Sequence, residues 1–229
     1  QWCGRVALNI TVSDADADQL RAIAPQGRYL TVPNGVDVGA FRPAAGSGKG
    51  VVYVGGTTWF PNRDALDYWS AEIHPLFRQL VGDVPVKWVG RATEQEQRQF
   101  AADPGIELTG YVQDVRPYVH EAGCFIVPLR IGGGTRLKIL DAWAMGKAVV
   151  STSIGCEGLR AVDGQNILIR DSPKEFAEAV ALVLRDAALR QRLGAAARQT
   201  VEETYSWEVL SQPMIEAYLG VIAGLPPTG

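Results

Sequence analysis

The sequence predicts an α/β protein in which helices cover both faces of a parallel sheet. Short, almost continuous apolar runs alternate with helical patterns over most of the 229 residues. Several runs end at glycine or proline, which is typical of buried strands that give way to a loop and a helix. Because parallel strands need crossover connections, this alternation indicates a Rossmann-like sheet.

Six apolar runs are the expected strands of this sheet, and they cover residues 51–54, 86–89, 106–109, 124–127, 148–151 and 166–169. The expected helices include residues 63–80, 93–102, 114–121, 173–185, 188–204 and 207–222. Pro61 should start the first helix and Pro75 should break or restart it, because proline lacks an N–H group. Thr93 and Glu96 have the spacing of a capping box.

The N-terminal segment forms a different unit, with a strand at 9–12, a helix at 14–24 and a strand at 29–32. One such βαβ piece is too small to fold alone. Residues 43–50 have the composition of a linker. The predicted parts are the end of an N-terminal domain with its linker at 1–43, the sheet domain at 44–204, and a terminal helix packing back toward the N-terminal unit at 205–229.

The composition and charge of the chain exclude several classes of function. The net charge is −3 and no cluster of lysines and arginines exists, so no nucleic-acid partner is expected. The longest apolar runs are too short to cross a bilayer. With two histidines and three cysteines that lack metal-ligand spacing, no metal site is expected. This cysteine usage fits the reducing cytoplasm.

The most informative stretch is residues 128–152, PLRIGGGTRLKILDAWAMGKAVVST. Gly132, Gly133 and Gly134 lack Cβ atoms, so the backbone can turn tightly and present its N–H groups to an anion. Thr135 adds a hydroxyl at the start of the following helix. The free amides of a helix start carry roughly half a positive charge. The stretch therefore predicts a phosphate site.

Lys138 and Asp141 stand three residues apart on the narrow polar face of this otherwise apolar helix. In one interpretation they pair with each other. In the other, Lys138 contacts a phosphate and Asp141 accepts hydrogen bonds from sugar or ribose hydroxyls, since a carboxylate is purely an acceptor.

Four stretches, in chain order, carry a family resemblance. They are VSDADADQLR with VPNGVDVGAF, then VVYVGGTTWFPNRDAL, then ELTGYVQDVRPYVHEAGCFIVPLRIGGGTRLKILDAWAMGKAVVST, and finally TYSWEVLSQPMIEAYL. Together they are spread over residues 12–219, so the match extends over nearly the whole chain. They resemble the nucleotide-sugar-binding C-terminal half of a family 4 glycosyltransferase with the GT-B fold. The variant with PNRDAL and GGGTRLK looks most like bacterial transferases of polysaccharide assembly.

The resemblance implies transfer of a hexosyl-type sugar, with retention of configuration, from an NDP-sugar with UDP or GDP as the nucleotide. It implies a glycan or lipid-linked acceptor and no obligatory metal or other cofactor. Residues 1–43 would then be the end of the acceptor domain, so this chain should bind the donor but transfer little sugar alone. The expected location is the cytoplasm, at the inner face of the membrane.

The resemblance also implies the members of the donor site. The amides of Gly133, Gly134 and Thr135 would hold the diphosphate. Asp141, at the second glutamate of the family's Glu-x7-Glu motif, would hold the ribose hydroxyls. The other implied members are Gly55, Gly56 and Thr57 near the phosphates, Gly90, Arg91, Tyr111 and Val112 around the base, and Arg130 and Lys138, or Arg63 and Arg136, as counter-charges.

One departure leaves the sugar contact open, because the first glutamate of that motif falls on Gly133. Glu157 follows the fifth strand of the sheet at its carboxyl end, where ligands bind in such sheets. Glu157 and Asp141 are therefore the catalytic candidates, with helix capping as the alternative role for Glu157.

Three other functions compete. A dinucleotide-dependent oxidoreductase would need a G-x-G-x-x-G turn, which VGGTTWFPN lacks. A GT-B sugar epimerase would need catalytic carboxylates and a histidine that the chain does not display. A non-catalytic module that binds nucleotide sugars stays open.

Overall fold

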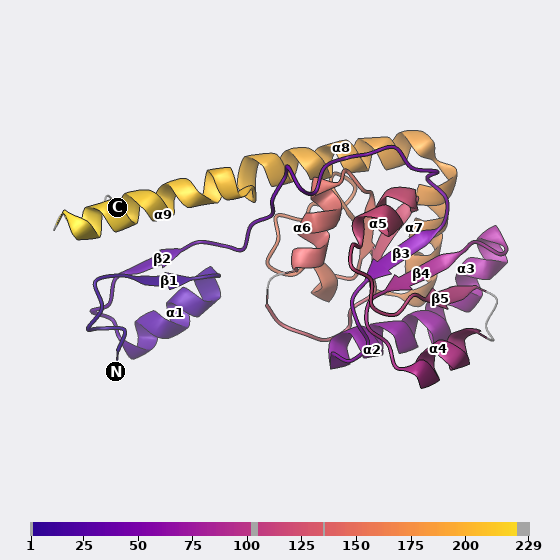
Figure 1. The fold of residues 1–229 in the computed structure, drawn as a ribbon, viewed down its shortest axis with the longest axis horizontal. Coiled ribbons are helices and arrows are strands. Elements are labelled where there is room, and N and C mark those ends of the chain that lie inside the picture. Colours follow the sequence, from indigo (N-terminus) through magenta and orange to yellow (C-terminus); the bar gives the residue numbers. More distant parts are fainter. Residues whose placement is uncertain (1, 102–104, 135, 224–229) are drawn as a thin grey trace.

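A computed structural model describes residues 2–101, 105–134 and 136–223. At its centre lies a six-stranded parallel sheet in the order β5-β4-β3-β6-β7-β8 (Figure 1). The strands are β3 (Val51–Val54), β4 (Val86–Val89), β5 (Ile106–Leu108), β6 (Cys124–Val127), β7 (Val149–Ser151) and β8 (Leu168–Ile169). The predicted Rossmann-like α/β fold is confirmed.

The strand order determines where a ligand site can lie. From β3 the chain runs outward through β4 to β5, then returns to β6 on the other side of β3 and continues to β7 and β8. The connections after β3 and β6 therefore leave in opposite directions. In open parallel sheets this switch point opens a crevice at the carboxyl ends of the two strands.

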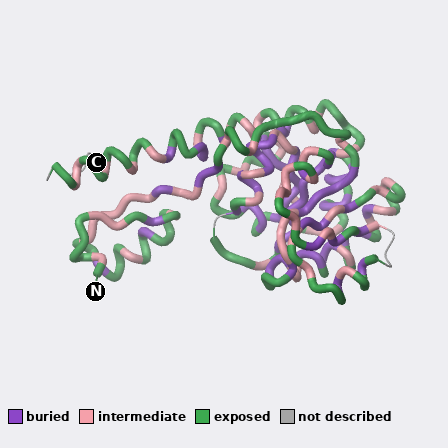
Figure 2. Tube along the Cα trace, in the orientation of Figure 1, coloured by how far each residue is buried: buried purple, intermediate pink, exposed green. Residues whose placement is uncertain are grey.

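Helices cover both faces of the sheet (Figure 1). The helices of the sheet domain are α2 (Phe60–Tyr68), α3 (His74–Val81), α4 (Glu94–Ala101), α5 (Arg116–Glu121), α6 (Leu137–Ala144), α7 (Pro173–Arg185) and α8 (Ala187–Thr204). Helix α9 (Trp207–Ile222) instead runs from α8 away from the sheet (Figure 1). Helix α3 packs against α7, and α6 packs against α8. Because both faces are covered, the strands are mostly apolar, and buried residues concentrate in the sheet (Figure 2).

Two predicted elements differ from the structure in informative ways. The helix expected at 63–80 is α2, a π-helical turn (Trp69–Ile73) and α3, with Pro75 in the first turn of α3. The missing N–H of proline prevents continuous α-helical bonding, and the π turn absorbs the break. The strand expected at 166–169 is shorter, because Asn166 uses its side chain to bond the main chain of Arg160 and Val162 in a turn.

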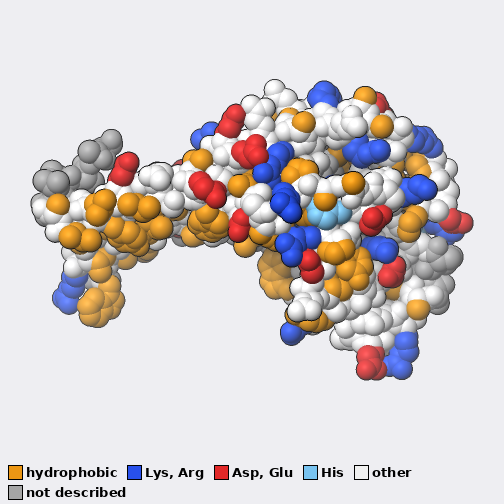
Figure 3. Space-filling view, turned by 45° about the horizontal axis from the view of Figure 1, so that its top comes forward, with side chains coloured by type: hydrophobic (Ala, Val, Ile, Leu, Met, Phe, Trp, Pro, Cys, Tyr) orange, Lys and Arg blue, Asp and Glu red, His pale blue; other side chains and the backbone are white. Residues whose placement is uncertain are grey.

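The N-terminal unit pairs β1 (Asn9–Thr11) in parallel with β2 (Tyr29–Thr31) and carries α1 (Asp14–Ile23). The chain then reaches the junction of α8 and α9, where Val36 N–H donates to the Tyr205 carbonyl at 2.8 Å. Figure 3 shows hydrophobic side chains gathered along α9 and the N-terminal unit. The three-part domain division stays a prediction. None of the described helices has the length and apolarity needed to span a membrane.

Candidate functional site

The loops after β3 and β4 meet through bare glycines at the switch-point side of the sheet. A Cβ on Gly90 would lie 2.6 Å from the Gly56 nitrogen, and one on Gly56 would lie 3.0 Å from the Arg91 carbonyl oxygen. No side chain fits at either position without moving backbone. The structure thus brings Gly55, Gly56 and Arg91 together, as predicted.

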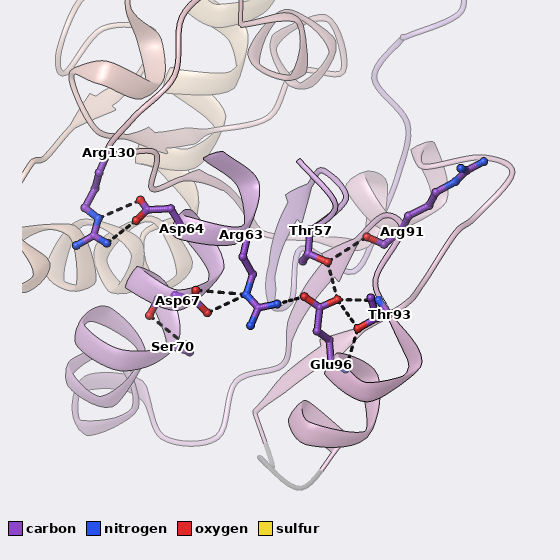
Figure 4. A network of polar contacts seen from close by, with 9 residues as sticks. All are labelled: Thr57, Arg63, Asp64, Asp67, Ser70, Arg91, Thr93, Glu96 and Arg130. Atoms are coloured by element: carbon purple, nitrogen blue, oxygen red, sulfur yellow. Dashed lines mark hydrogen bonds and ion pairs between the residues drawn. The ribbon is translucent and has the colours of Figure 1, made fainter. Parts of the chain in front are cut away.

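Thr57 is held by a network of polar contacts with Arg91 and Glu96 (Figure 4). Its N–H donates to the Arg91 carbonyl at 2.8 Å, and its hydroxyl donates to Glu96 Oε2 at 2.9 Å. Glu96 also accepts from the N–H of Thr93 at 2.7 Å, which confirms the predicted capping box, and pairs with Arg63. Burial alone would raise the pKa of Glu96, but the bonds from Thr93 and Thr57 and the Arg63 charge hold it below its usual value.

The glycine turn after β6 presents unused amides. Gly134 has φ +84°, a conformation that favours glycine, and a Cβ there would meet nothing within 4 Å. The N–H groups of Gly133 and Gly134 make no hydrogen bond to any residue that the structure describes. Thr135 lies outside the described residues, so its predicted role is untested. The described turn has the open, donor-rich character that a diphosphate needs.

Arg136 holds this turn in place, and its implied role as a counter-charge of the ligand stays a prediction. Its side chain is 3% exposed. It donates to the carbonyl oxygens of Gly132 and Ile154 at 2.9 Å each, and to that of Gly133 at 3.3 Å. The guanidinium therefore ties the glycine turn to the short helical turn (Ile154–Cys156) that follows β7.

Glu157 lies beside this anchor. Its Oε2 is 3.9 Å from Nη2 of Arg136, and its side chain is 71% exposed. It makes no side-chain hydrogen bond to a described backbone N–H, so the helix-capping alternative finds no support. Its carboxylate stands next to the glycine turn and is accessible from solvent.

The interpretation of Lys138 and Asp141 as an ion pair is wrong. The Lys138 ammonium donates to the Tyr53 hydroxyl at 2.6 Å and to Asn62 Oδ1 at 2.8 Å. The Asp141 carboxylate has no hydrogen-bond or ion-pair partner among the described residues. Burial, together with the charge of Arg136, lowers the pKa of Lys138 to about 7, and burial raises the pKa of Asp141 to about 6. A half-buried acceptor thus faces the site unpaired.

This unpaired carboxylate should cost stability at neutral pH. Because the pKa of Asp141 is raised from 3.8 to about 6 in the folded state, the folded protein holds this proton more tightly than the unfolded chain does. Stability is then lost as pH rises from about 4 to about 6. Asp141→Asn is expected to raise the free energy of unfolding by about 1–3 kcal/mol at about pH 8 and to change it little at about pH 4. Urea unfolding at both pH values measures this, and an unchanged stability at the higher pH contradicts it.

Arg130 is paired with acidic side chains of α2 and the π turn (Figure 4). Its guanidinium pairs with Asp64 at 2.7 Å and with Glu72 at 3.4 Å, and it lies 4.4 Å from the ring centroid of Tyr68. These carboxylates balance its charge in the structure, and its assignment as a diphosphate counter-charge stays a prediction. Arg63 is likewise paired, with Glu96 and Asp67.

The predicted base-contact residues do lie together. A bridge between Gly90 and Gly110 joins the ends of β4 and β5. Beyond it, the Tyr111 side chain is exposed, with the Arg91 guanidinium 5.2 Å from its ring centroid, and Val112 packs partly against the core. An exposed ring with a neighbouring cation can stack on a nucleobase.

Two surface hollows, of about 340 and 440 Å³, lie between α4 and β5 and contain none of the predicted site residues. The first is lined by residues at the amino ends of β4 and β5, whereas the glycine turn follows the carboxyl end of β6. No group of three His, Cys, Asp or Glu side chains placed to hold a metal occurs within the described ranges. The independence from a metal that the resemblance implies remains a prediction.

Sequence reasoning missed Tyr53 and Asn62. Tyr53 is fully buried, stacks on Trp88 with the ring centroids 3.8 Å apart, and donates to Asn62. In the sequence, Tyr53 is one of the four residues of an apolar run, and Asn62 is a polar residue near the start of a helix. No spacing links either one to Lys138, which lies more than 70 residues further along the chain.

A sheet of this strand order, with donor-rich glycine turns at its switch point, defines a Rossmann-type ligand-binding domain. Residues 48–186 match the family described as "Glycosyl transferases group 1". This match covers more than half of the chain, which therefore belongs to the group 1 glycosyl transferases and has the fold of their C-terminal GT-B domain. The predicted transferase class is confirmed, the oxidoreductase alternative is wrong, and assignment to family 4 stays a prediction.

Three similar proteins illustrate the relationship. The chain is 30% identical over 137 residues to the lipopolysaccharide core biosynthesis glycosyltransferase LpsE of Rhizobium meliloti (strain 1021), covering 56% of this chain and 38% of LpsE. It is 24% identical over 163 residues to an uncharacterized 44.6 kDa protein in the cps region of Klebsiella pneumoniae, covering 68% of this chain and 42% of that protein. The chain thus spans about two fifths of these relatives.

The fold is also that of a mutant of S. aureus TarM, solved in complex with Fondaparinux, alpha-GlcNAc-glycerol and UDP. The TM-score is 0.75 at 15% identity, covering 96% of this chain and 44% of TarM. At this identity the likeness concerns the fold alone.

Proposed function

We propose that this chain binds the donor of a retaining glycosyltransferase, an NDP-sugar carrying UDP or GDP. The complete enzyme would transfer the sugar, without an obligatory metal, to a glycan or lipid-linked acceptor during polysaccharide assembly at the inner face of the membrane. Two relatives support this assignment, one named for lipopolysaccharide core biosynthesis and one from a cps region. The complex of TarM with UDP supports the choice of nucleotide.

The observation that carries the proposal is the combination at α6. Two unused amides, those of Gly133 and Gly134, precede the helix, and an unpaired half-buried carboxylate, Asp141, lies on its second turn. Asp141 stands about 6 Å along the helix axis from the first residue of α6, at a rise of about 1.5 Å per residue. Amides suit a diphosphate, and a lone carboxylate suits two neighbouring hydroxyls.

Asp141→Asn is expected to weaken UDP or GDP binding about tenfold to a hundredfold and to leave inorganic diphosphate binding nearly unchanged. The amide keeps the shape but replaces one acceptor oxygen by a donor, so the hydroxyl contacts lose about 1.5–3 kcal/mol. Calorimetric titration of the chain with each ligand measures the two affinities. Asp83→Asn, an exposed change before β4, is the matched control and should alter neither.

Equal losses for both ligands would remove Asp141 from the ribose site. A titration with UDP, GDP, ADP and NAD tests the class of ligand. Tight NAD binding without NDP binding would overturn the donor assignment. Activity of the complete protein on a lipid-linked or glycan acceptor distinguishes an enzyme from a non-catalytic module, and release of free sugar epimer instead would favour the epimerase.

A further inference from the structure

Three side chains from three separate elements meet beneath the switch point. Tyr53 belongs to β3, Asn62 to α2 and Lys138 to the first turn of α6. The ammonium of Lys138 lies 2.6 Å from the Tyr53 hydroxyl and 4.1 Å from the centroid of that ring. Asn62 then donates from Nδ2 to the Gly56 carbonyl at 2.9 Å. The cluster therefore links α6, which follows the glycine turn, to the loop that follows β3.

The hydrogen bonds of this cluster can run in one direction only. Lysine has no acceptor, so Lys138 donates to both the Tyr53 hydroxyl and Asn62 Oδ1. Tyr53 must then donate its own proton to Asn62 Oδ1, and the Asn62 amide nitrogen faces the Gly56 carbonyl. Loss of any one member removes the orientation of the next.

The charge of Lys138 has no acid to balance it within the described structure. The groups that face it are the neutral Tyr53 of β3 and Asn62 of α2, while Arg136 on its own segment is a second cation. Burial raises the pKa of Tyr53 far above its usual value, so its hydroxyl stays protonated. Asp141, on the same helix, is not bonded to it. An anion bound on the glycine turn would supply the missing negative charge.

We propose that Tyr53 and Asn62 are positioning residues of the donor site, which hold the Lys138 ammonium at the switch point as the counter-charge of a bound diphosphate and fix the Gly56 loop with the same contacts. The inference rests on the proposed donor function. It makes the phosphate affinity of the glycine turn depend on two residues on the other side of the crevice.

The arrangement sets the direction of a pH effect. Burial and Arg136 lower the pKa of Lys138 to about 7 in the free protein. A bound anion favours the charged form and raises that pKa again, so binding takes up a proton. Diphosphate affinity should therefore fall as pH rises above about 7.

The test measures inorganic diphosphate and UDP binding by calorimetry at about pH 6.5 and about pH 8.5, values on either side of this pKa. The proteins are the full chain, Tyr53→Phe, Asn62→Ala, Lys138→Met and the control Tyr68→Phe. The control also removes a hydroxyl that donates a hydrogen bond, to the Asp171 carbonyl at 3.1 Å, but away from Lys138. The protonation changes of the ligand and of Asp141 are common to all five proteins. Any difference from the unaltered chain in the pH dependence of binding therefore reports on Lys138.

Tyr53→Phe, which deletes one oxygen, should weaken diphosphate binding about threefold to tenfold at the higher pH and much less at the lower pH, because Lys138 loses an acceptor that favours its charge. Asn62→Ala should behave alike, and Lys138→Met should bind weakly with a flatter pH profile. Tyr68→Phe should match the unaltered chain. Unchanged affinity and pH profile in Tyr53→Phe and Asn62→Ala overturn the positioning role. Failure of the unaltered chain to bind either ligand would instead overturn the proposed function itself.

Discussion

Arg136→Met is expected to lower the thermal midpoint by about 6–12 °C. The guanidinium is almost fully buried and serves the carbonyl oxygens of Gly132, Gly133 and Ile154, none of which a methionine can satisfy. The three carbonyl oxygens belong to exposed residues, so water can partly replace the guanidinium; each lost hydrogen bond then costs about 1 kcal/mol, and the total is about 3 kcal/mol. For a chain of this size, 1 kcal/mol shifts the midpoint by about 2–4 °C.

The same variant should also lose NDP affinity, because the glycine turn loses its attachment to the turn after β7. Differential scanning calorimetry and ligand titration on one preparation measure both effects. Arg98→Met, which removes the same charge from a side chain that is 77% exposed, is the control and should leave both values near those of the unaltered chain. A midpoint within about 2 °C of the unaltered chain, less than 1 kcal/mol in this size range, would show that Arg136 does not anchor the turn.

Gly134→Val is expected to weaken NDP binding about thirtyfold to a thousandfold. The valine has to adopt φ +84°, which a β-branched residue resists, and its methyl groups would occupy the open space above the turn. The loss corresponds to one or two charge-assisted hydrogen bonds, about 2–4 kcal/mol. An added Cβ at this position meets no protein atom within 4 Å, so the cost to folding should come from backbone strain alone.

Gly82→Val is the matched control for this strain. Gly82 has φ +74° and open space around a Cβ, but it lies between α3 and β4, away from the glycine turn. Both variants should lose similar stability, whereas only Gly134→Val should lose NDP affinity. If Gly134→Val binds as the unaltered chain does, the glycine turn does not contact the phosphates.

The sequence alone determined the order of strands and helices, the Rossmann-like class and the place of the glycine turn. These features depend on interactions between residues close together in the chain. Apolar runs of four residues, Pro61 and Pro75 at helix starts, and the Thr93–Glu96 capping box all act locally. The family resemblance was equally readable, because its motifs are contiguous stretches.

Only the tertiary structure decided which charged side chains are free for a ligand. Lys138 and Asp141 share one helix, yet Lys138 is held by Tyr53 and Asn62 and Asp141 stays unpaired. Arg130, which follows the fourth strand of the chain's main sheet, is instead balanced by carboxylates on α2 and the π turn. Such partners meet through the packing of elements far apart in the chain. The desolvation and charge balance that set their roles arise only where those elements meet, so no spacing along the sequence encodes them.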